Sequence, residues 1–158
     1  MSVRPPESTP QLSAQPAAPA DGAQAHLLAA LLFTAALALF GQTSQFGFLN
    51  FDDIEYVSNC PEVAAGLSPG GVWWAFTHSH VGQWHPLTTL SFMLDASLWG
   101  LGSGGFHLHN ALLHGLAAVL LFHALRALTG ALWRSALAAA LFTLHPLRVE
   151  SVAWIAER

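Results

Sequence analysis

Lysine is absent from the 158 residues of this chain, and charge of either sign is scarce. Only 9% of the residues are charged, whereas 53% are hydrophobic. Because soluble domains carry about a quarter charged residues, this chain has too few to cover a surface that faces water. A bilayer is the better solvent for it. All the formal positive charge outside histidine comes from Arg4, Arg126, Arg134, Arg148 and Arg158.

Other absences exclude whole classes of site. The net charge of −4 argues against a nucleic-acid partner, which requires a basic patch. Cys60 is the single cysteine, so neither an intrachain disulfide nor a cysteine-based zinc site can form. No glycine-rich phosphate loop, nucleotide-binding fingerprint, nucleophile elbow, zinc-protease motif or internal repeat of 20–50 residues occurs.

The pattern of apolar residues predicts an all-α integral membrane protein with about three transmembrane helices. Residues 1–25 are rich in Pro, Ala, Ser and Gln and are expected to form a disordered cytoplasmic tail. Residues 26–158 are expected to form one membrane domain. Its spans are predicted at about 26–43, 106–128 and 131–145, with a loop at 44–105 and an amphipathic helix at 146–158. A core helix of a soluble domain is the alternative for the first span.

The loop at 44–105 contains signals for two short amphipathic helices. Ser68-Pro69 has the composition of an N-cap followed by proline at the first helical position. A second helix is expected from Pro86 to Leu98, where the glycine-rich run 100–105 breaks it. Such tryptophan-rich helices are typical of the lipid headgroup layer.

The arginines predict the topology. Arg126 and Arg134 flank the turn between the second and third spans, which favours the cytoplasmic side for that turn. The N-terminus is then cytoplasmic as well. The loop 44–105 and the segment 145–158 both fall on the extracytoplasmic face.

Adjacent carboxylates follow the first span. Asp52 and Asp53, with Glu55 close behind, are unusual in a chain so poor in charge. A carboxylate at a membrane surface can act as a general base or hold a hard cation. On an extended strand the two aspartates would point to opposite faces, one toward a substrate and the other toward a loop or an arginine. The alternative is a solvated pair that caps a helix.

Histidines form a second group of candidates. His107, Asn110 and His114 make one polar stripe on the second span, as expected for a face turned toward a bundle interior. Hydrogen bonds to helices outside this chain are the simplest role for His114 and His123. A metal site is the alternative, but this helix has no histidine pair at i, i+4. We therefore assign no metal ligand.

A short motif occurs twice. Trp84-His85-Pro86 in the loop resembles Leu144-His145-Pro146 after the third span. In both, proline can start a helix while histidine projects at its mouth, where it could meet a phosphate. Two unrelated helix starts are the alternative.

Several strings together resemble a known family. They are Phe51-Asp52-Asp53 with Tyr56-Val57, Val72-Trp73-Trp74-Ala75-Phe76-Thr77, Trp84-His85-Pro86-Leu87-Thr88, Met93-Leu94-Asp95, His107-Leu108-His109-Asn110, and His145-Pro146-Leu147-Arg148-Val149-Glu150-Ser151-Val152-Ala153-Trp154-Ile155-Ala156-Glu157-Arg158. They span roughly residues 27–158. The chain resembles the N-terminal part of bacterial membrane proteins that carry a GT-C-type glycosyltransferase domain followed by tetratricopeptide repeats. Those proteins are similar to eukaryotic transmembrane O-mannosyltransferases.

The resemblance implies a partial GT-C fold in the bacterial inner membrane. It implies transfer of a sugar from a polyprenyl-phosphate donor to a hydroxyl of an exported protein, on the extracytoplasmic face. Membrane lipid and further helices and repeats downstream are the other implied partners, with no cofactor assigned and a divalent metal unsupported. The implied catalytic residues are Asp52 and Asp53. Those for the donor phosphate are His85, His145, Arg148 and Arg158, with Glu55, Asp95 and Glu150 in support.

A non-enzymatic interpretation stays open. The chain would then be a membrane anchor or assembly subunit, or an inactive product of a truncated gene. In that case the polar stripe of His107, Asn110 and His114 packs against partner helices, and changes to the aspartates have no effect.

Overall fold

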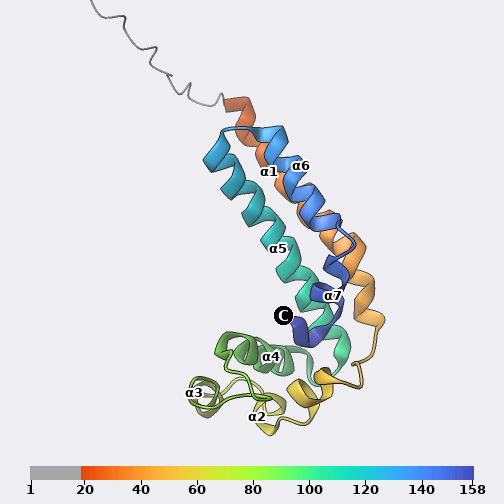
Figure 1. Ribbon diagram of the computed structural model, residues 1–158, viewed down its shortest axis with the longest axis vertical. Helices are drawn as coiled ribbons and strands as arrows, with labels where there is room; N and C mark the ends of the chain where they lie inside the picture. Colours follow the sequence, from red (N-terminus) through yellow and green to blue (C-terminus); the bar gives the residue numbers. More distant parts are fainter. Residues whose placement is uncertain (1–18) are drawn as a thin grey trace, which may run out of the picture.

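The computed structural model describes residues 19–158, which form helices joined by short loops. Figure 1 shows an elongated molecule whose long axis is a bundle of α1 (Pro19–Phe40), α5 (Ser103–Thr129) and α6 (Leu132–Leu144). Each of these three helices packs against the other two. The shorter helices gather at one end of the bundle. The predicted all-α class is confirmed for the described residues.

The expected disordered tail, residues 1–25, falls mostly on residues 1–18, which lie outside the described part of the chain. Residues 19–25 belong to α1, so the expectation is wrong for them. Ala25 is buried in one apolar cluster with Phe122 of α5. Nη2 of Arg126 donates to the backbone carbonyl of Asp21 at 3.4 Å. These contacts hold the first turns of α1 against α5.

Two stretches have the length and composition of membrane spans: Asp21–Gln45, which continues α1 through the 3-10 helix η1 (Gly41–Gln45), and α5. The segment expected at 131–145 forms α6, with 13 residues. At 1.5 Å per residue α6 is roughly 20 Å long, shorter than a hydrocarbon core of about 30 Å. The described residues therefore contain two candidate spans, with a shorter apolar helix beside them, in place of the expected three.

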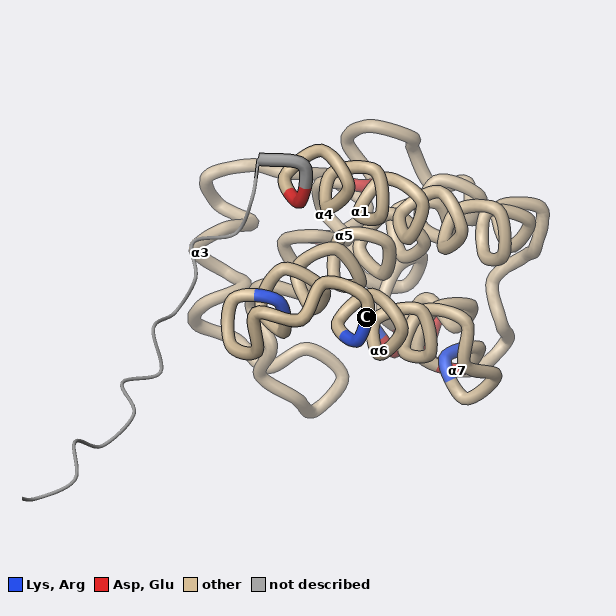
Figure 2. The backbone as a smooth tube through the Cα atoms, turned by 90° about the horizontal axis from the view of Figure 1, so that it is seen from above, with Lys and Arg blue, Asp and Glu red and all other residues tan. Residues whose placement is uncertain are grey.

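The outer surface of the bundle is apolar. Leucines on all three helices are exposed, among them Leu31, Leu116, Leu120 and Leu137. Figure 2 shows the helices from above with few charged positions along them. Soluble proteins rarely expose large contiguous apolar patches, so this surface is typical of one that faces lipid.

The loop between the first two spans folds into its own small helical layer. It contains the π-helix η2 (Ile54–Ser58), α2 (Pro61–Ala64), α3 (Pro69–Thr77) and α4 (Pro86–Trp99). The predicted N-cap is confirmed, since Oγ of Ser68 accepts a hydrogen bond from the backbone N–H of Gly71 at 3.0 Å. The layer packs around Phe92, Phe106 and Ile155, all fully buried.

The glycine run ends one helix and starts the next. α4 stops at Gly100, whose φ of +68° favours glycine. Gly104 and Gly105, expected to lie in the break, belong to the first turn of α5. A Cβ atom at Gly104 would lie 2.6 Å from the carbonyl oxygen of Ser44, so glycine allows α5 to approach the end of the first span.

The end of the chain departs from the single amphipathic helix expected at 146–158. It forms α7 (Arg148–Ala153) and the 3-10 helix η3 (Ile155–Glu157), separated by Trp154 in an extended conformation. Nδ2 of Asn110 donates to the carbonyls of Val152 and Trp154, both at 3.2 Å, and these bonds hold the break in place. We call residues 152–158 the C-terminal strap, because they cross from α7 to α4 (Figure 1).

Candidate functional site

The two aspartates have separate environments. Asp53 is fully buried. Its Oδ2 accepts the backbone N–H of Leu49 at 3.0 Å, and its Oδ1 accepts that of Ala156 at 2.9 Å. The first bond closes the turn before Asp53, and the second joins Asp53 to the C-terminal strap. The side chain of Asp53 therefore fixes the loop in which its neighbour lies.

Asp52 is half-buried, and none of the described residues donates a hydrogen bond to its carboxylate. Both aspartates have helical backbone at the start of η2, so the extended strand considered from the sequence is wrong. The carboxylate of Asp53 orients a loop, and that of Asp52 is half-buried. That Asp52 faces a substrate stays a prediction.

A buried tyrosine lies beside Asp52. Burial raises the pKa of the Tyr56 phenol above its usual value, and the carboxylates of Asp52 and Glu157 raise it further. The phenol therefore stays protonated at neutral pH. Its oxygen lies 3.4 Å from Nε2 of His85. Asp52 and Glu157, distant in sequence, thus both act on the Tyr56 phenol.

Two histidines continue this group into the loop layer. The rings of His80 and His85 lie 6.5 Å apart between centroids, and His80 packs edge-on against Trp74. Burial lowers the pKa of His80 below its usual 6.5, and His85 lowers it further. His85 lies at the N-terminus of α4, as expected, with its ring turned toward the Tyr56 phenol.

A cleft of about 250 Å³ opens between α5, α6 and α7. Arg148 and Arg158, both expected to bind phosphate, line it together with Ser151 and Glu157. The guanidinium of Arg148 lies over the ring of Phe142, 4.5 Å from its centroid. A cation–π contact of this kind orients the guanidinium while leaving its N–H groups free to donate.

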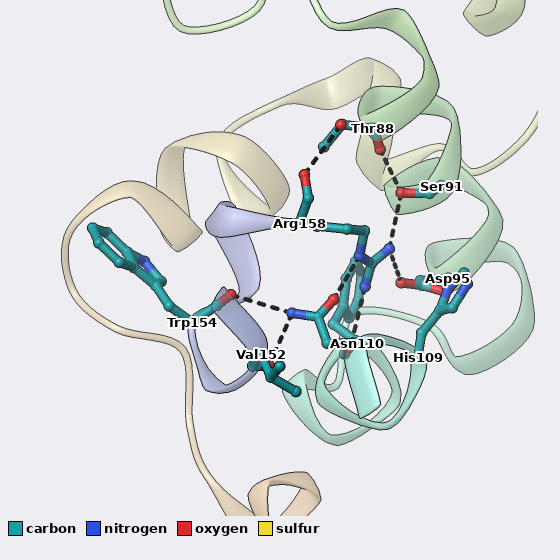
Figure 3. A network of polar contacts seen from close by, with 9 residues as sticks. Thr88, Ser91, Asp95, His109, Asn110, Val152, Trp154 and Arg158 are labelled. Carbon is teal, nitrogen blue, oxygen red and sulfur yellow. Dashed lines mark hydrogen bonds and ion pairs between the residues drawn. The ribbon is translucent and has the colours of Figure 1, made fainter. Parts of the chain in front are cut away.

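Arg158 is engaged inside the protein (Figure 3). Its Nη1 lies 2.6 Å from Oδ2 of Asp95, and its Nε donates to Oδ1 of Asn110 at 2.6 Å. Further bonds run to Oγ of Ser91 and the carbonyl of Phe106, both at 3.0 Å. Burial lowers the pKa of the guanidinium, and the carboxylate of Asp95 opposes that shift. The Arg158 side chain is therefore an internal cation that borders the cleft. The resemblance implies an arginine available to bind phosphate.

Asp95, expected in a supporting role, is fully buried on α4. It forms ion pairs with Arg158 and with Nδ1 of His109 on α5. Two basic groups from different elements thus converge on one carboxylate. This arrangement gives Asp95 a structural function that its sequence context did not specify.

The remaining predicted residues lie apart from this group. His145 is exposed and borders a separate apolar cavity of about 380 Å³ between α1 and α6. Glu150 is exposed beside another cavity, and Glu55 accepts a hydrogen bond from the side-chain amide of Asn59 at 2.8 Å. The structure therefore brings Arg148 and Arg158 together and leaves His85 and His145 in two other places.

Each residue of the polar stripe on α5 has a backbone carbonyl partner within the chain, although Nδ1 of His107 is buried without a partner among the described residues. Asn110 binds the strap, and Nε2 of His114 lies 3.0 Å from the carbonyl of Thr143 on α6. His107 makes a similar contact: its Nε2 lies 3.4 Å from the carbonyl oxygen of Gly47. His114 does bond between helices, but its partner is α6 of this chain instead of another helix. Packing of the stripe against partner helices stays a prediction, as does the role of His123.

Sequence reasoning missed two members of the site. Glu157 lay in the last motif but was not assigned, and Tyr56, the single tyrosine, appeared only within a matched string. A lone tyrosine three residues after Asp53 in a helical segment was the available signal. Among the described residues, no group of three or more His, Cys, Asp or Glu side chains is arranged to hold a metal ion.

Comparison with known proteins identifies relatives. The chain is 41% identical over 78 residues to Protein O-mannosyl-transferase Tmtc2 of Drosophila melanogaster. This alignment covers 49% of this chain and 8% of that protein. It is 30% identical over 141 residues to Protein O-mannosyl-transferase TMTC1 of Homo sapiens, and this alignment covers 82% of this chain and 16% of that protein. With human Protein O-mannosyl-transferase TMTC4 it shares 31% over 145 residues, covering 78% and 19%.

These matches span less than a fifth of the length of the relatives. No family model and no solved structure matches the chain. The relatives are animal proteins, so the bacterial inner membrane stays a prediction. The homologues of this chain are therefore protein O-mannosyl-transferases of the TMTC family, matched over part of their length.

Proposed function

We propose that this chain forms part of a membrane glycosyltransferase that moves a sugar from a polyprenyl-phosphate donor to a protein hydroxyl on the extracytoplasmic face. The names of the relatives support glycosyl transfer in general. The observation that carries the assignment of residues is the difference between the two aspartates: Asp53 is saturated by backbone donors, and Asp52 is accessible and without a donor among the described residues.

In the proposed reaction, Asp52 is the catalytic residue. Its carboxylate accepts the proton of the acceptor hydroxyl as that oxygen attacks the anomeric carbon. The bond between the anomeric carbon and the phosphate oxygen breaks, and the polyprenyl phosphate leaves with the electron pair. The phenol of Tyr56, whose pKa is raised by burial, Asp52 and Glu157, stays protonated beside Asp52. The acceptor can therefore form hydrogen bonds there before it loses its proton.

The leaving phosphate requires positive or donor groups. Arg148 and Ser151 on the cleft are the residues that can supply them, because the guanidinium of Arg148 is held over Phe142 without an acidic partner among the described residues. Arg158 contributes to the local potential while its N–H groups remain bound to Asp95, Asn110, Ser91 and Phe106. Glu157 lines the cleft, and Glu157 and Asp52 both raise the pKa of the Tyr56 phenol, which relates the cleft to the aspartate turn.

A transfer assay in membranes tests this proposal. Radiolabelled polyprenyl-phosphate mannose and a Ser/Thr-rich acceptor peptide are supplied to the wild-type chain and to Asp52→Asn, Arg148→Gln and Glu62→Gln. We expect transfer to be lost in Asp52→Asn with its membrane abundance unchanged, and to require more donor in Arg148→Gln. Glu62→Gln, at an acidic residue of α2 outside the site, should behave as wild type. Equal transfer by Asp52→Asn would overturn the role of Asp52.

The non-catalytic alternative predicts a different result. An anchor or assembly subunit gives no transfer in any variant, and its partners co-purify equally with wild type and Asp52→Asn. Absence of transfer by the wild-type chain, with normal abundance, favours that alternative.

A further inference from the structure

A buried arginine ties the end of the C-terminal strap to two helices, in addition to the bonds from Asn110 to the strap carbonyls. Arg158 reaches two separate helices: α4 through Asp95 and Ser91, and α5 through Asn110 and the carbonyl of Phe106 (Figure 3). The carbonyl of Arg158 also accepts a hydrogen bond from Oγ1 of Thr88 at 3.4 Å. Only 6% of the Arg158 side chain is exposed, so the interaction is shielded from solvent.

The strap in turn holds the aspartate pair. The backbone N–H of Ala156, two residues before Arg158, donates to Oδ1 of Asp53. Ile155 is fully buried in the core of the loop layer, and Val152 packs with Phe40 and Ala111 of the bundle. Displacement of the strap would therefore leave one oxygen of Asp53 without its donor and free the turn that carries Asp52.

We infer that Asp95 and Arg158 are positioning residues for the proposed carboxylate site: they clamp the strap between α4 and α5, and the strap sets the place of Asp52 and Glu157 through Asp53. This inference rests on the proposed function. It assigns to the pair an effect on the chemical step, distinct from donor binding.

The geometry explains why arginine is required. Arginine presents several N–H groups in a rigid plane, so one side chain can bind a carboxylate, an amide oxygen, a hydroxyl and a carbonyl together. Lysine retains the charge but not this fork. Arg158→Lys should thus keep the chain folded while loosening the strap. If the role of Arg158 were purely electrostatic, lysine would hold the strap as well as arginine does.

A thiol-labelling experiment tests the clamp without reference to activity. Val152→Cys places a thiol at a position that is 2% exposed. The native Cys60 is buried, and burial raises the pKa of its thiol, so it reacts slowly and gives a low background. In intact membranes, a water-soluble maleimide should label Val152→Cys slowly. It should do so about tenfold faster, or more, when Arg158→Lys or Asp95→Asn is added, because local opening then exposes the site.

Transfer kinetics supply the second readout. In Arg158→Lys and Asp95→Asn we expect kcat to fall by about tenfold to a hundredfold, as misplacement of a reacting group produces, with KM for the donor unchanged. Arg134→Lys is the matched control, because Arg134 is exposed on α6, outside the site. The double variant Asp95→Leu/Arg158→Met removes both charges together, so neither is left buried and unpaired. It should recover abundance without recovering kcat.

Three results would overturn the inference. Unchanged labelling in Arg158→Lys and Asp95→Asn would mean that the pair does not hold the strap. Faster labelling with unchanged kcat would mean that the strap does not position the carboxylates. Loss of folded protein in every variant, Arg158→Lys included, would make the pair a folding element alone. If Asp52→Asn keeps full activity, the proposed function fails, yet labelling still reports on the clamp.

Discussion

Oδ1 of Asp53 accepts a hydrogen bond from the backbone N–H of Ala156 at 2.9 Å, and this bond joins the first loop to the end of the described chain. This bond accompanies the full burial of Asp53, whereas Asp52 remains half-buried. Two identical neighbouring side chains thereby acquire different environments. Mutations at the two positions should separate stability from activity.

We expect Asp53→Ala to destabilise the fold by about 3 kcal/mol, because two backbone N–H groups lose a charged acceptor. Thermal unfolding in detergent, followed by circular dichroism, measures the change. Asp52→Ala is the matched control and should shift the free energy of unfolding by no more than about 0.5 kcal/mol, as is usual at accessible positions. Equal destabilisation by both changes would contradict the separate environments of the two aspartates.

His80 should make the loop layer less stable in acid. Its pKa is lowered in the folded protein by burial, so the unfolded chain binds the proton more readily. The contribution of His80 to stability is present above the unfolded value of 6.5 and falls as pH drops below it, toward the lower folded pKa. Tryptophan fluorescence during denaturant titration at pH 7.5 and 5.5 measures this, since Trp74 contacts His80. His80→Gln should show a smaller difference between the two pH values than wild type.

Gly115 should be intolerant of larger side chains. A Cβ atom there would lie 2.8 Å from Cδ2 of Phe33 on α1, closer than carbon atoms normally approach. Gly115→Val should therefore lower stability by about 1–3 kcal/mol through overpacking. The second change Phe33→Ala should restore part of that loss. Thermal unfolding of the single and the double variant measures both effects. If Phe33→Ala restores no stability, the clash with Phe33 is not the cause of the loss.

The tryptophans of the loop layer should contact the headgroup region. Trp73 on α3 is 72% exposed, and Trp84, before α4, is 63% exposed. Indole rings prefer the membrane interface. In vesicles, lipids brominated near the headgroup should quench fluorescence more than lipids brominated near the chain ends. Trp73→Phe/Trp84→Phe should reduce this quenching, and an unchanged signal would mean that other tryptophans produce it.

Local features of the structure could be predicted because their signals lie within a few residues. The N-cap at Ser68, the start of α4 at Pro86 and its end at Gly100 each depend on the backbone preference of one residue type. The polar face of α5 followed from its helical period, but the partners of His114 and Asn110 did not. Those partners come from α6 and the strap, and periodicity carries no information about which element packs on a face.

The site was predictable in part for the same reason. The aspartate pair drew attention through charge in an apolar chain, and Arg148 through a matched motif. The ion pair of Asp95 with Arg158 joins elements distant in sequence, so neither residue revealed its partner. The phosphate-binding role of Arg158 was implied by the resemblance, because a phosphate leaving group needs positive or donor groups. Burial between α4 and α5 gives it internal acceptors instead.

The strap also determines the order in which the molecule can be completed. During synthesis, Asp53 and Asp95 leave the ribosome long before Ala156 and Arg158, their partners in the finished fold. Until then Asp53 has the backbone N–H of Leu49 as its donor and Asp95 has His109, but neither has its partner in the strap. The loop layer can therefore acquire its final arrangement only after both candidate spans and α6 are made. Assembly of the site is thereby coupled to insertion of the helices that precede the strap.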